Sequence, residues 1–272
     1  MRLGFHTNGL QNHRLDEGLR LLADHGYEAV ALTPDVCHLD PFRCSPREVD
    51  AIASLLQKLS LSCSIETGAR FLLDRATKHE PTLMTRSEEG RALRLDYLRR
   101  AARMGQDLGA RVVSFWTGID REPGPDSRTR MLTGVREAAA VIRESGREPS
   151  LEPEPGMALS TFAQWRELRR ELGPESPSLT LDVGHLYAEV EGDPVAICRE
   201  AARHCAQVHL EDMATGVHEH LLPGDGDVDF RGVLGALRDG GYGGPVCFEL
   251  SRHSHAAPHA VHVCRQTWLA HR

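Results

Sequence analysis

Short apolar segments alternate with longer amphipathic segments along the whole chain. The segment from 46 to 59 shows the amphipathic type, because Val49, Ile52, Leu55 and Leu56 fall on one side of a helix with Pro46 in its first turn. The short segments are apolar and do not alternate with polar residues, which is typical of parallel strands covered on both faces. The pattern therefore predicts strand and helix units that follow one another in strict alternation.

Eight such units span the chain. We expect strands over 2–6, 28–32, 61–65 and 110–115 in the first half, and strands that end at Glu152, Asp182, His209 and Glu249 in the second half. Helices are expected over 14–25, 46–59, 87–108, 127–145, 160–172, 194–203, 230–239 and from 258 onward. Eight units suit a closed barrel better than an open sheet. The predicted fold class is therefore α/β: one (β/α)8 TIM barrel with a C-terminal helix and an extended loop after the third strand.

The chain length agrees with this fold, since 272 residues are close to the size of about 250 residues that a (β/α)8 barrel typically needs. No linker or low-complexity stretch interrupts the pattern. We therefore expect a single domain over residues 1–272.

Composition narrows the class of partner and the compartment. A formal net charge of −7 and an aromatic content of 5% disfavour a nucleic-acid-binding surface, which relies on basic and stacking side chains. The chain has no secretory signal at its start and no run of about eighteen apolar residues. Its seven cysteines form no C-x-x-C pair and mostly lie in apolar segments, as buried free thiols do. We predict a cytoplasmic protein with neither a nucleic-acid nor a membrane partner.

Candidate chemistry appears where the last four predicted strands end. Glu152, Asp182, His209 and Glu249 each close one strand, and in a barrel of this type the catalytic groups lie at the C-terminal ends of the strands. Two glutamates, one aspartate and one histidine form a mostly oxygen ligand set that suits a divalent ion such as Mn²⁺, Mg²⁺, Co²⁺ or Zn²⁺. The sequence therefore predicts one divalent metal ion at this face.

Other residues at the same face are candidates for substrate contact. His6, Glu66 and Trp116 stand at the ends of the first, third and fourth strands. The long segment after the third strand carries Arg70 beside apolar residues, which is typical of a lid that closes over a site, although a solvated loop with a small apolar core has the same composition. Arg252 follows the last strand and is interpreted either as a contact to a substrate hydroxyl or phosphate, or as a salt bridge to a neighbouring helix.

Local motifs carry a resemblance that extends over essentially the whole chain. They are Leu-Glu-Pro-Glu-Pro-Gly at 151–156, Asp-Val-Gly-His at 182–185, Val-His-Leu-Glu-Asp at 208–212 and Gly-Asp-Gly-Asp-Val-Asp-Phe at 224–230. With them the chain resembles the xylose isomerase-like barrels, which include sugar-phosphate isomerases and epimerases, ketose 3-epimerases, inosose dehydratase and endonuclease IV. The resemblance implies that Glu152, Asp182, His209 and Glu249 are the metal ligands. It favours Glu152 over Glu154 as the ligand after the fifth strand and leaves Glu154 for substrate contact.

The resemblance gives three histidines two alternative roles. In isomerase-type relatives the residue that matches His185 faces the substrate, which implies substrate contact by His185 and by His220. In endonuclease IV the positions of His185, His218 and His220 bind a further metal, so a second metal at these three residues is the alternative. The nuclease also uses histidines after its third and fourth strands, where this chain has Glu66 and Phe115 or Trp116, and this difference argues against a centre of three metals. Asp212 is interpreted either as support for a metal ligand or as an ordinary loop cap.

The resemblance implies a metal-dependent isomerase or epimerase of a sugar, a sugar acid or a cyclitol. The reaction would proceed by abstraction of the proton next to a carbonyl through a metal-stabilised enediolate, with Glu152 and Glu249 as acid and base. The main alternative is dehydration of a keto-cyclitol at the same site, while hydrolysis of DNA phosphoesters and sugar binding without turnover are less favoured. The expected partner is a small carbohydrate or cyclitol, and a homo-oligomer is a further expectation.

Overall fold

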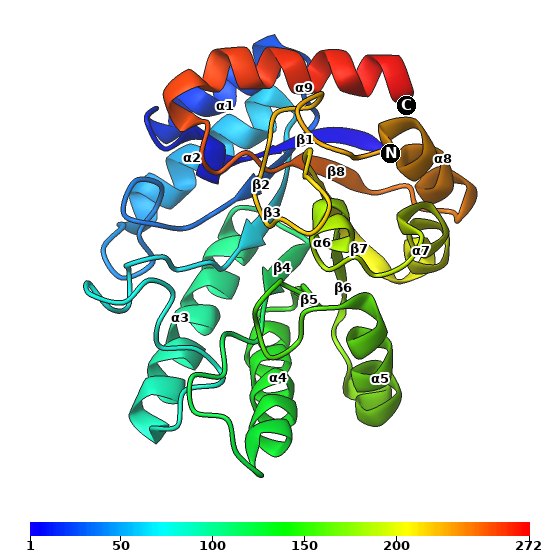
Figure 1. Ribbon diagram of the computed structural model, residues 1–272. Coiled ribbons are helices and arrows are strands. Elements are labelled where there is room, and N and C mark those ends of the chain that lie inside the picture. The colour runs from blue at the N-terminus through cyan, green and yellow to red at the C-terminus, as the bar shows by residue number, and fades with distance from the viewer.

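The eight strands form one closed parallel barrel in chain order, with β8 paired to β1 (Figure 1). The computed structural model describes all residues from 1 to 272. The strands are β1 (Arg2–His6), β2 (Ala29–Leu32), β3 (Ser62–Glu66), β4 (Val112–Phe115), β5 (Glu148–Leu151), β6 (Ser178–Asp182), β7 (Cys205–Leu210) and β8 (Pro245–Phe248). The predicted TIM barrel is confirmed.

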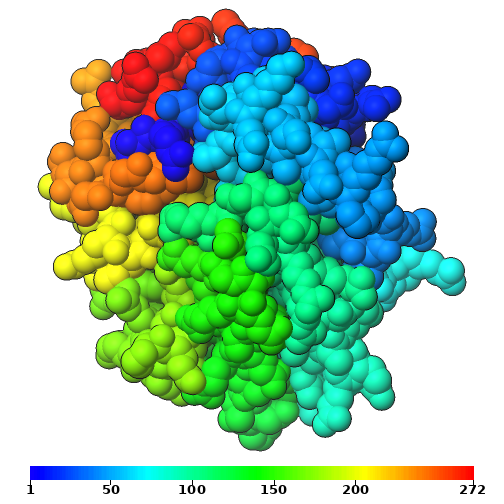
Figure 2. Space-filling model, turned by 180° about the vertical axis from the view of Figure 1, so that it is seen from behind, coloured from blue at the N-terminus to red at the C-terminus, as the bar shows by residue number.

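Helices follow the strands and cover the outside of the barrel. They are α1 (Leu15–Asp24), α2 (Pro46–Leu59), α3 (Glu88–Asp107), α4 (Ser127–Arg143), α5 (Phe162–Leu172), α6 (Val183–Ala188), α7 (Pro194–Ala201), α8 (Phe230–Asp239) and α9 (Ala257–His271). Figure 2 shows them from behind, where the colours succeed one another in chain order around the surface. The C-terminal helix α9 is confirmed, and it packs against α8 and β1. No helix is both long enough and apolar enough to cross a lipid bilayer.

Several predicted boundaries differ from the observed ones by one or two residues, and one helix was not predicted. Helix α6 begins directly after β6, because the Asp182 carboxylate accepts the backbone N–H of His185 and caps the first turn. Six residues are too few to show an amphipathic pattern, so this helix could not be predicted from periodicity. Glu152 and Glu249 lie one residue beyond β5 and β8, although their backbone N–H groups still bond to the neighbouring strands.

The prediction that the strands do not alternate is wrong. Side chains of a strand point alternately to its two faces. On the face toward the helices stand large apolar residues such as Phe5, Leu181 and Phe248, which belong to one core cluster of 63 buried residues. On the inner face of β1, β2 and β8 stand small residues, and Ala29, Ala31 and Cys247 form a separate cluster. A Cβ at Gly4 would collide with the sulfur of Cys247, so this interior has no space for a larger residue.

The inner face of β4 to β6 carries hydroxyl groups instead. Ser114, Ser150 and Thr180 form a chain of buried hydrogen bonds, with oxygen separations of 2.9 and 2.7 Å. The alternation accounts for the position of the candidate ligands, because Glu152 and Asp182 come two residues after Ser150 and Thr180 and therefore point inward one layer higher. A packed lower layer thus forms the floor on which the charged layer lies.

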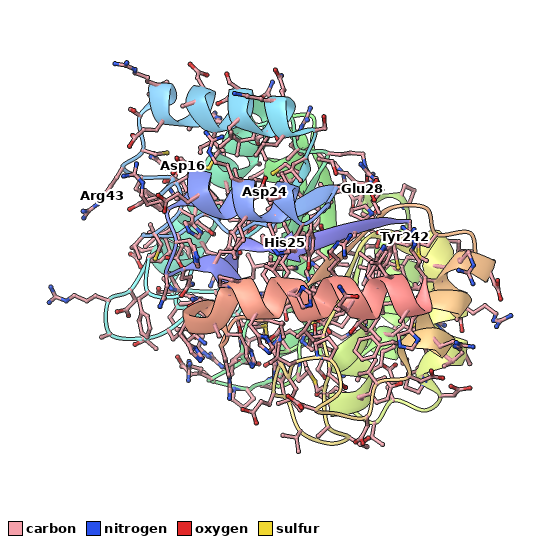
Figure 3. The ribbon with its side chains drawn as sticks, turned by 90° about the horizontal axis from the view of Figure 1, so that it is seen from above. Asp16, Asp24, His25, Glu28, Arg43 and Tyr242 are labelled. Carbon is pink, nitrogen blue, oxygen red and sulfur yellow. The ribbon has the colours of Figure 1, made fainter.

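The two ends of the barrel differ in their loops. Figure 3 shows Glu28 and Tyr242 at the end where strands begin, and Arg43 at the opposite end, in the long connection that follows β2. At that opposite end the connection from 67 to 87, between β3 and α3, contains no helix or strand, as predicted for the extended loop. It folds back on itself, because the backbone N–H of His79 donates to the carbonyl of Arg70 and the His79 ring Nδ1 lies 2.7 Å from the carbonyl of Gly68.

Candidate functional site

A cavity of about 290 Å³ opens at the C-terminal ends of the strands, and only 3 of its 20 lining residues are hydrophobic. A wall of this polarity suits a ligand with many hydroxyl groups better than an apolar one. Most residues predicted to meet a substrate line it, namely His6, Glu66, Arg70, Trp116, Glu154, His220 and Arg252, together with Glu152, His218 and Glu249. Asp182, His185 and His209 are buried and do not line it.

The four predicted metal ligands converge beneath this cavity. One ligand atom from each of Glu152, Asp182, His209 and Glu249 lies within 4.8 Å of the others. They come from the ends of four consecutive strands, and three of the four side chains are fully buried. We call these four residues the acidic group.

His209 stands between the carboxylates. Its Nδ1 atom is 2.9 Å from Glu152 Oε1 and 3.4 Å from Glu249 Oε2, while its Nε2 atom is 3.4 Å from Glu66 Oε1. Burial lowers the pKa of His209, but Glu152 and Glu66 outweigh it and raise the pKa well above the ordinary value. Burial raises the pKa of Glu152 to about 8. Glu66 and the side-chain amide of Gln207, which is 3.1 Å from His209 Nε2, both lie on the Nε2 side of the ring, so Nδ1 faces the acidic group. Such outer contacts are the usual support of a ligating histidine.

Two residues near the end of β1 contact the Glu249 carboxylate: His6, which ends the strand, and Asn8, which follows it. The side-chain amide of Asn8 donates to Glu249 Oε1 at 2.8 Å, and His6 Nδ1 lies 3.6 Å from Oε2. Burial raises the pKa of Glu249, but His6, His220 and His209 together lower it to about 2. Asn8 follows His6 by two residues at the end of the first strand, where the barrel pattern indicates site residues.

The acidic group fits a divalent cation. Oδ1 of Asp182 accepts the N–H of His185 at 3.0 Å, but the buried Oδ2 atom has no hydrogen-bond partner. A buried carboxylate oxygen without a partner is costly, and three converging carboxylates repel one another. A cation among them supplies the missing partner and offsets the repulsion, and the mixed oxygen and nitrogen donors suit Mn²⁺, Co²⁺ or Zn²⁺.

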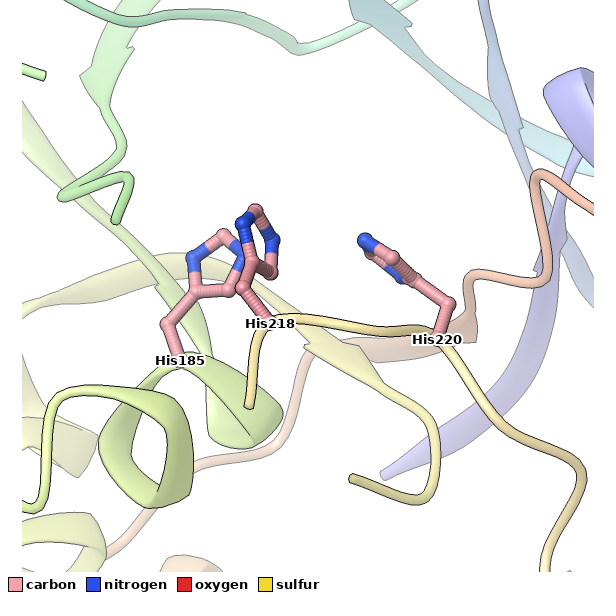
Figure 4. Close-up of side chains that lie close together, drawn as sticks. All are labelled: His185, His218 and His220. Carbon is pink, nitrogen blue, oxygen red and sulfur yellow. The ribbon is translucent and has the colours of Figure 1, made fainter. Parts of the chain in front are cut away.

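Three histidines form a second cluster beside the acidic group (Figure 4). The ring of His218 lies 4.9 Å from that of His185 and 5.5 Å from that of His220. The Nδ1 atoms of His185 and His220 lie 2.9 and 3.1 Å from the backbone carbonyls of Pro153 and Glu249. A proton on Nδ1 satisfies each carbonyl and leaves the Nε2 lone pair free. The buried Nε2 of His185 has no partner, and Glu154 Oε2 is 3.8 Å away from it.

The structure decides between the alternatives for Asp212 and Arg252. Asp212 contacts no member of the acidic group and instead accepts backbone N–H bonds from Met213, Gly224 and Val228, so it caps its loop. Arg252 forms its salt bridge with Glu219, at 2.7 Å, and this partner lies in the loop after β7 and not on a helix. The donors to Asp212 all lie within 16 residues after it in the chain, and such local bonds are the usual role of aspartate in turns.

A buried arginine behind Trp116 was not predicted. The guanidinium of Arg94, from α3, lies 4.3 Å from the centre of the Trp116 ring and donates to the carbonyl of Thr67 at 2.8 Å. Its side chain is fully buried, and the His79 ring meets Trp116 edge-on at 5.3 Å. Trp116 is thus fixed from behind and from one side. The only sequence signal was a charged residue on the buried face of a helix.

Glu211 is the second buried residue that was not predicted. Its side chain is fully buried, neither oxygen has a hydrogen-bond partner, and Oε2 lies 3.9 Å from His220 Nδ1. Burial and the charge of Asp182 raise the pKa of Glu211 well above its ordinary value. A Cβ at Gly184 would collide with Glu211 Oε1 and would lie 2.8 Å from Met213.

We expect Gly184→Ala to weaken both the fold and metal binding. The added methyl group forces Glu211 toward Asp182 and His220, and such overpacking typically costs about 1–3 kcal/mol. The measurement is thermal unfolding together with metal affinity. Gly235→Ala in α8 is the matched control, because an added Cβ there would lie 3.9 Å from the flexible end of the Arg238 side chain. Unchanged stability and metal affinity in Gly184→Ala would contradict the close contact.

Comparisons with known proteins agree with the geometry. A family model described as xylose isomerase-like TIM barrel matches residues 19–269. The chain is 25% identical over 258 residues to L-ribulose-5-phosphate 3-epimerase UlaE of Shigella flexneri serotype 5b (strain 8401), which covers 93% of this chain and 88% of that protein. It superimposes on a crystal structure of IOLI protein with a bound zinc atom (TM-score 0.78, 20% identity, 99% and 97% of the two chains). A D-psicose 3-epimerase crystallised in the presence of D-fructose is similar in fold (TM-score 0.77, 14% identity, 99% and 98%).

Proposed function

The chain belongs to the xylose isomerase-like TIM barrel family, and on that premise we propose that it is a metal-dependent isomerase or epimerase of a carbohydrate. The observation that carries the proposal is the convergence of Glu152, Asp182, His209 and Glu249 beneath a polar cavity. The proposal is supported by the similarity to L-ribulose-5-phosphate 3-epimerase UlaE and by a structure of the same fold that holds zinc.

The acidic group would hold one divalent ion. Asp182 Oδ2 has no other partner, and His209 Nδ1, which lies 2.9 Å from Glu152 Oε1, would offer its lone pair to the ion in place of that contact. A bound ion of this kind polarises a carbonyl and makes the proton on the adjacent carbon more acidic. Glu66 keeps the His209 ring in its orientation, and Asn8 keeps Glu249 in its orientation through Oε1.

Glu152 and Glu249 would move the proton. They follow β5 and β8, which are not neighbours in the barrel, so their carboxylates reach the cavity from different sides. Because Asn8 occupies Oε1 of Glu249, Oε2 is the atom available to take a proton. One carboxylate removes the proton next to the carbonyl and the other returns a proton, either to the opposite face of the same carbon or to the neighbouring carbon. The first outcome is epimerisation and the second is isomerisation.

The remaining cavity residues would bind and enclose the substrate. The free Nε2 atom of His220 can accept a hydrogen bond from a substrate hydroxyl, and Glu154 and His6 offer further polar contacts. His185 does not line the cavity and would act through Glu154, which lies 3.8 Å from its Nε2 atom. The Trp116 ring provides an apolar surface for the C–H face of a sugar. The loop from 67 to 87, which carries Arg70, would limit access of water to the reacting carbon.

The three-histidine cluster also supports a second candidate role, the binding of a second ion. Imidazoles whose Nδ1 is held by a backbone carbonyl are prepared for metal binding through Nε2. We propose hydrogen bonding to substrate as their function, and a content of two tightly bound ions per chain, reduced to one in His218→Ala, would assign the cluster to a second metal instead.

Proton exchange with solvent tests the proposed function. Metal-loaded protein is incubated in D₂O with a panel of ketoses, sugar acids, keto-cyclitols and their phosphate esters, and deuterium next to the carbonyl is detected by NMR. We expect exchange together with formation of an epimer or isomer for at least one compound class. Loss of water from a keto-cyclitol would identify the dehydratase alternative. The absence of exchange across the whole panel would refute the proposal.

A further inference from the structure

The charges of the cavity wall are arranged by depth. Glu66 and Glu152 are buried at its floor, where Glu249 also lies, whereas three basic side chains occupy the mouth. These are the half-buried Arg70 and the exposed Lys78, both from the loop after β3, and Arg252 from the loop after β8. Two loops that are distant in sequence therefore present cations above a floor of carboxylates.

These cations lack sufficient negative partners of their own. Neither Arg70 nor Lys78 forms a salt bridge or a side-chain hydrogen bond, and Arg252 is paired only with the exposed Glu219 through one nitrogen. Partial desolvation at the cavity mouth lowers the pKa of the otherwise exposed Lys78, and the neighbouring Arg70 lowers it further. Like charges that repel one another at the rim of a cavity are stabilised when an anion binds among them. The mouth thus has the charge pattern of an anion subsite.

We propose that the substrate is a phosphorylated ketose, with its phosphate held by Arg70, Lys78 and Arg252 and its carbonyl end above the acidic group. The inference rests on the proposed function and specifies the substrate class of that same site. A phosphate monoester carries nearly two negative charges and three acceptor oxygens, enough for one strong hydrogen bond to each of three cations. A carboxylate offers one charge and two oxygens, and would leave one of the cations without a partner.

The same arrangement fixes the direction in which the substrate enters. The carboxylates of the floor repel a phosphate, so only the neutral carbonyl end can approach Glu152 and Glu249. The local field at the mouth also allows an anion to approach a protein whose formal net charge is −7. Orientation and attraction thus come from one set of side chains, none of which belongs to the acidic group.

Paired substrates test the inference with the metal-loaded protein. Deuterium incorporation and turnover are measured for ribulose with ribulose 5-phosphate, xylulose with xylulose 5-phosphate, and fructose with fructose 6-phosphate, in both the D and L series. Because each charge-assisted hydrogen bond typically contributes about tenfold or more in binding, we expect kcat/KM to be about 100-fold higher or more for the phosphorylated member of the accepted pair. Equal or faster turnover of the free ketose would overturn the inference and leave the proposed function intact.

Variants separate a phosphate contact from a structural role. Arg70→Ala combined with Lys78→Ala should lower kcat/KM for the phosphorylated ketose by about 100-fold, at least tenfold more than it lowers kcat/KM for the free ketose. Arg75→Ala is the matched control, since Arg75 is an exposed arginine of the same loop that does not line the cavity. An equal loss for both substrates would mean that the two cations only support the fold of the loop, and would refute the subsite.

A binding measurement provides a readout that does not depend on turnover. Inorganic phosphate is titrated into the metal-loaded protein and its binding is followed by ³¹P NMR line width. We expect binding that weakens at least tenfold in the Arg70→Ala and Lys78→Ala double variant and persists in Arg75→Ala. Binding of equal strength in the double variant would place the phosphate on the metal ion and overturn the inference, whether or not any ketose is turned over.

Discussion

Glu249→Gln should lower kcat by about 10³-fold at saturating metal, which is within the range that a positioned acid or base contributes. Glutamine has the shape of glutamate, and its amide oxygen can still accept the hydrogen bond that Asn8 donates to Oε1. The replaced Oε2 is the atom to which we assign the proton, so the change removes proton transfer while the cavity keeps its shape. Glu152→Gln should give a loss of similar size, because an epimerisation needs a group on each side of the carbon.

The measurement is kcat at several Mn²⁺ concentrations, with the metal content of each variant determined in parallel. Excess metal is expected to restore occupancy but not turnover. Glu144→Gln serves as the control, because Glu144 is an exposed glutamate that only pairs with Arg99 on the outside of the barrel. A metal-loaded Glu249→Gln protein with near-native kcat would show that another group moves the proton.

Removal of the metal should abolish activity and lower thermal stability together. Without a cation, three carboxylates converge around His209 and repel one another, and one oxygen of Asp182 has no partner. Both effects lower the free energy of unfolding. A ligand present at one hundred times its Kd stabilises the folded state by about 2.7 kcal/mol. For a protein of this size, we expect Tm to rise by roughly 5–10 °C on metal binding.

The measurement compares thermal unfolding of chelated protein with and without added Mn²⁺, Co²⁺ or Zn²⁺. Asp182→Asn should remove most of the rise in Tm, since it withdraws a ligand charge from the acidic group. The wild-type protein measured without and with added metal serves as its own control. Full activity in metal-free protein would contradict the assignment of the acidic group.

The architecture followed from the sequence because each strand and helix has a local signal. Caps such as Ser45 before α2 and Thr161 before α5 mark helix starts, and both form capping boxes in the structure. The residues of the acidic group could be predicted because strand ends in a barrel converge whatever the loops do. Glu152 was preferred over Glu154 by resemblance, and the structure brings Glu152 into the acidic group while Glu154 lies beside His185.

The supporting residues were harder to predict, because their roles depend on neighbours distant in the sequence. Arg94 meets Trp116 only after α3 packs on the barrel, and Glu211 becomes buried against Gly184 only because α6 begins at the end of β6. The polar chain through Ser114, Ser150 and Thr180 was overlooked because these residues are small and each lies in an otherwise apolar strand. Such contacts across the barrel leave no periodic pattern along the chain.

The most direct test of the central claim is deuterium incorporation from D₂O into the carbon next to the substrate carbonyl, measured in one experiment on three preparations. They are the metal-loaded protein, the same protein stripped of metal, and metal-loaded Glu249→Gln. We predict rapid incorporation in the first, none above background in the second, and incorporation slowed by about 10³-fold in the third. Incorporation that continues at the same rate without metal, or in Glu249→Gln, would contradict a reaction in which a cation held by the acidic group and its glutamates act together.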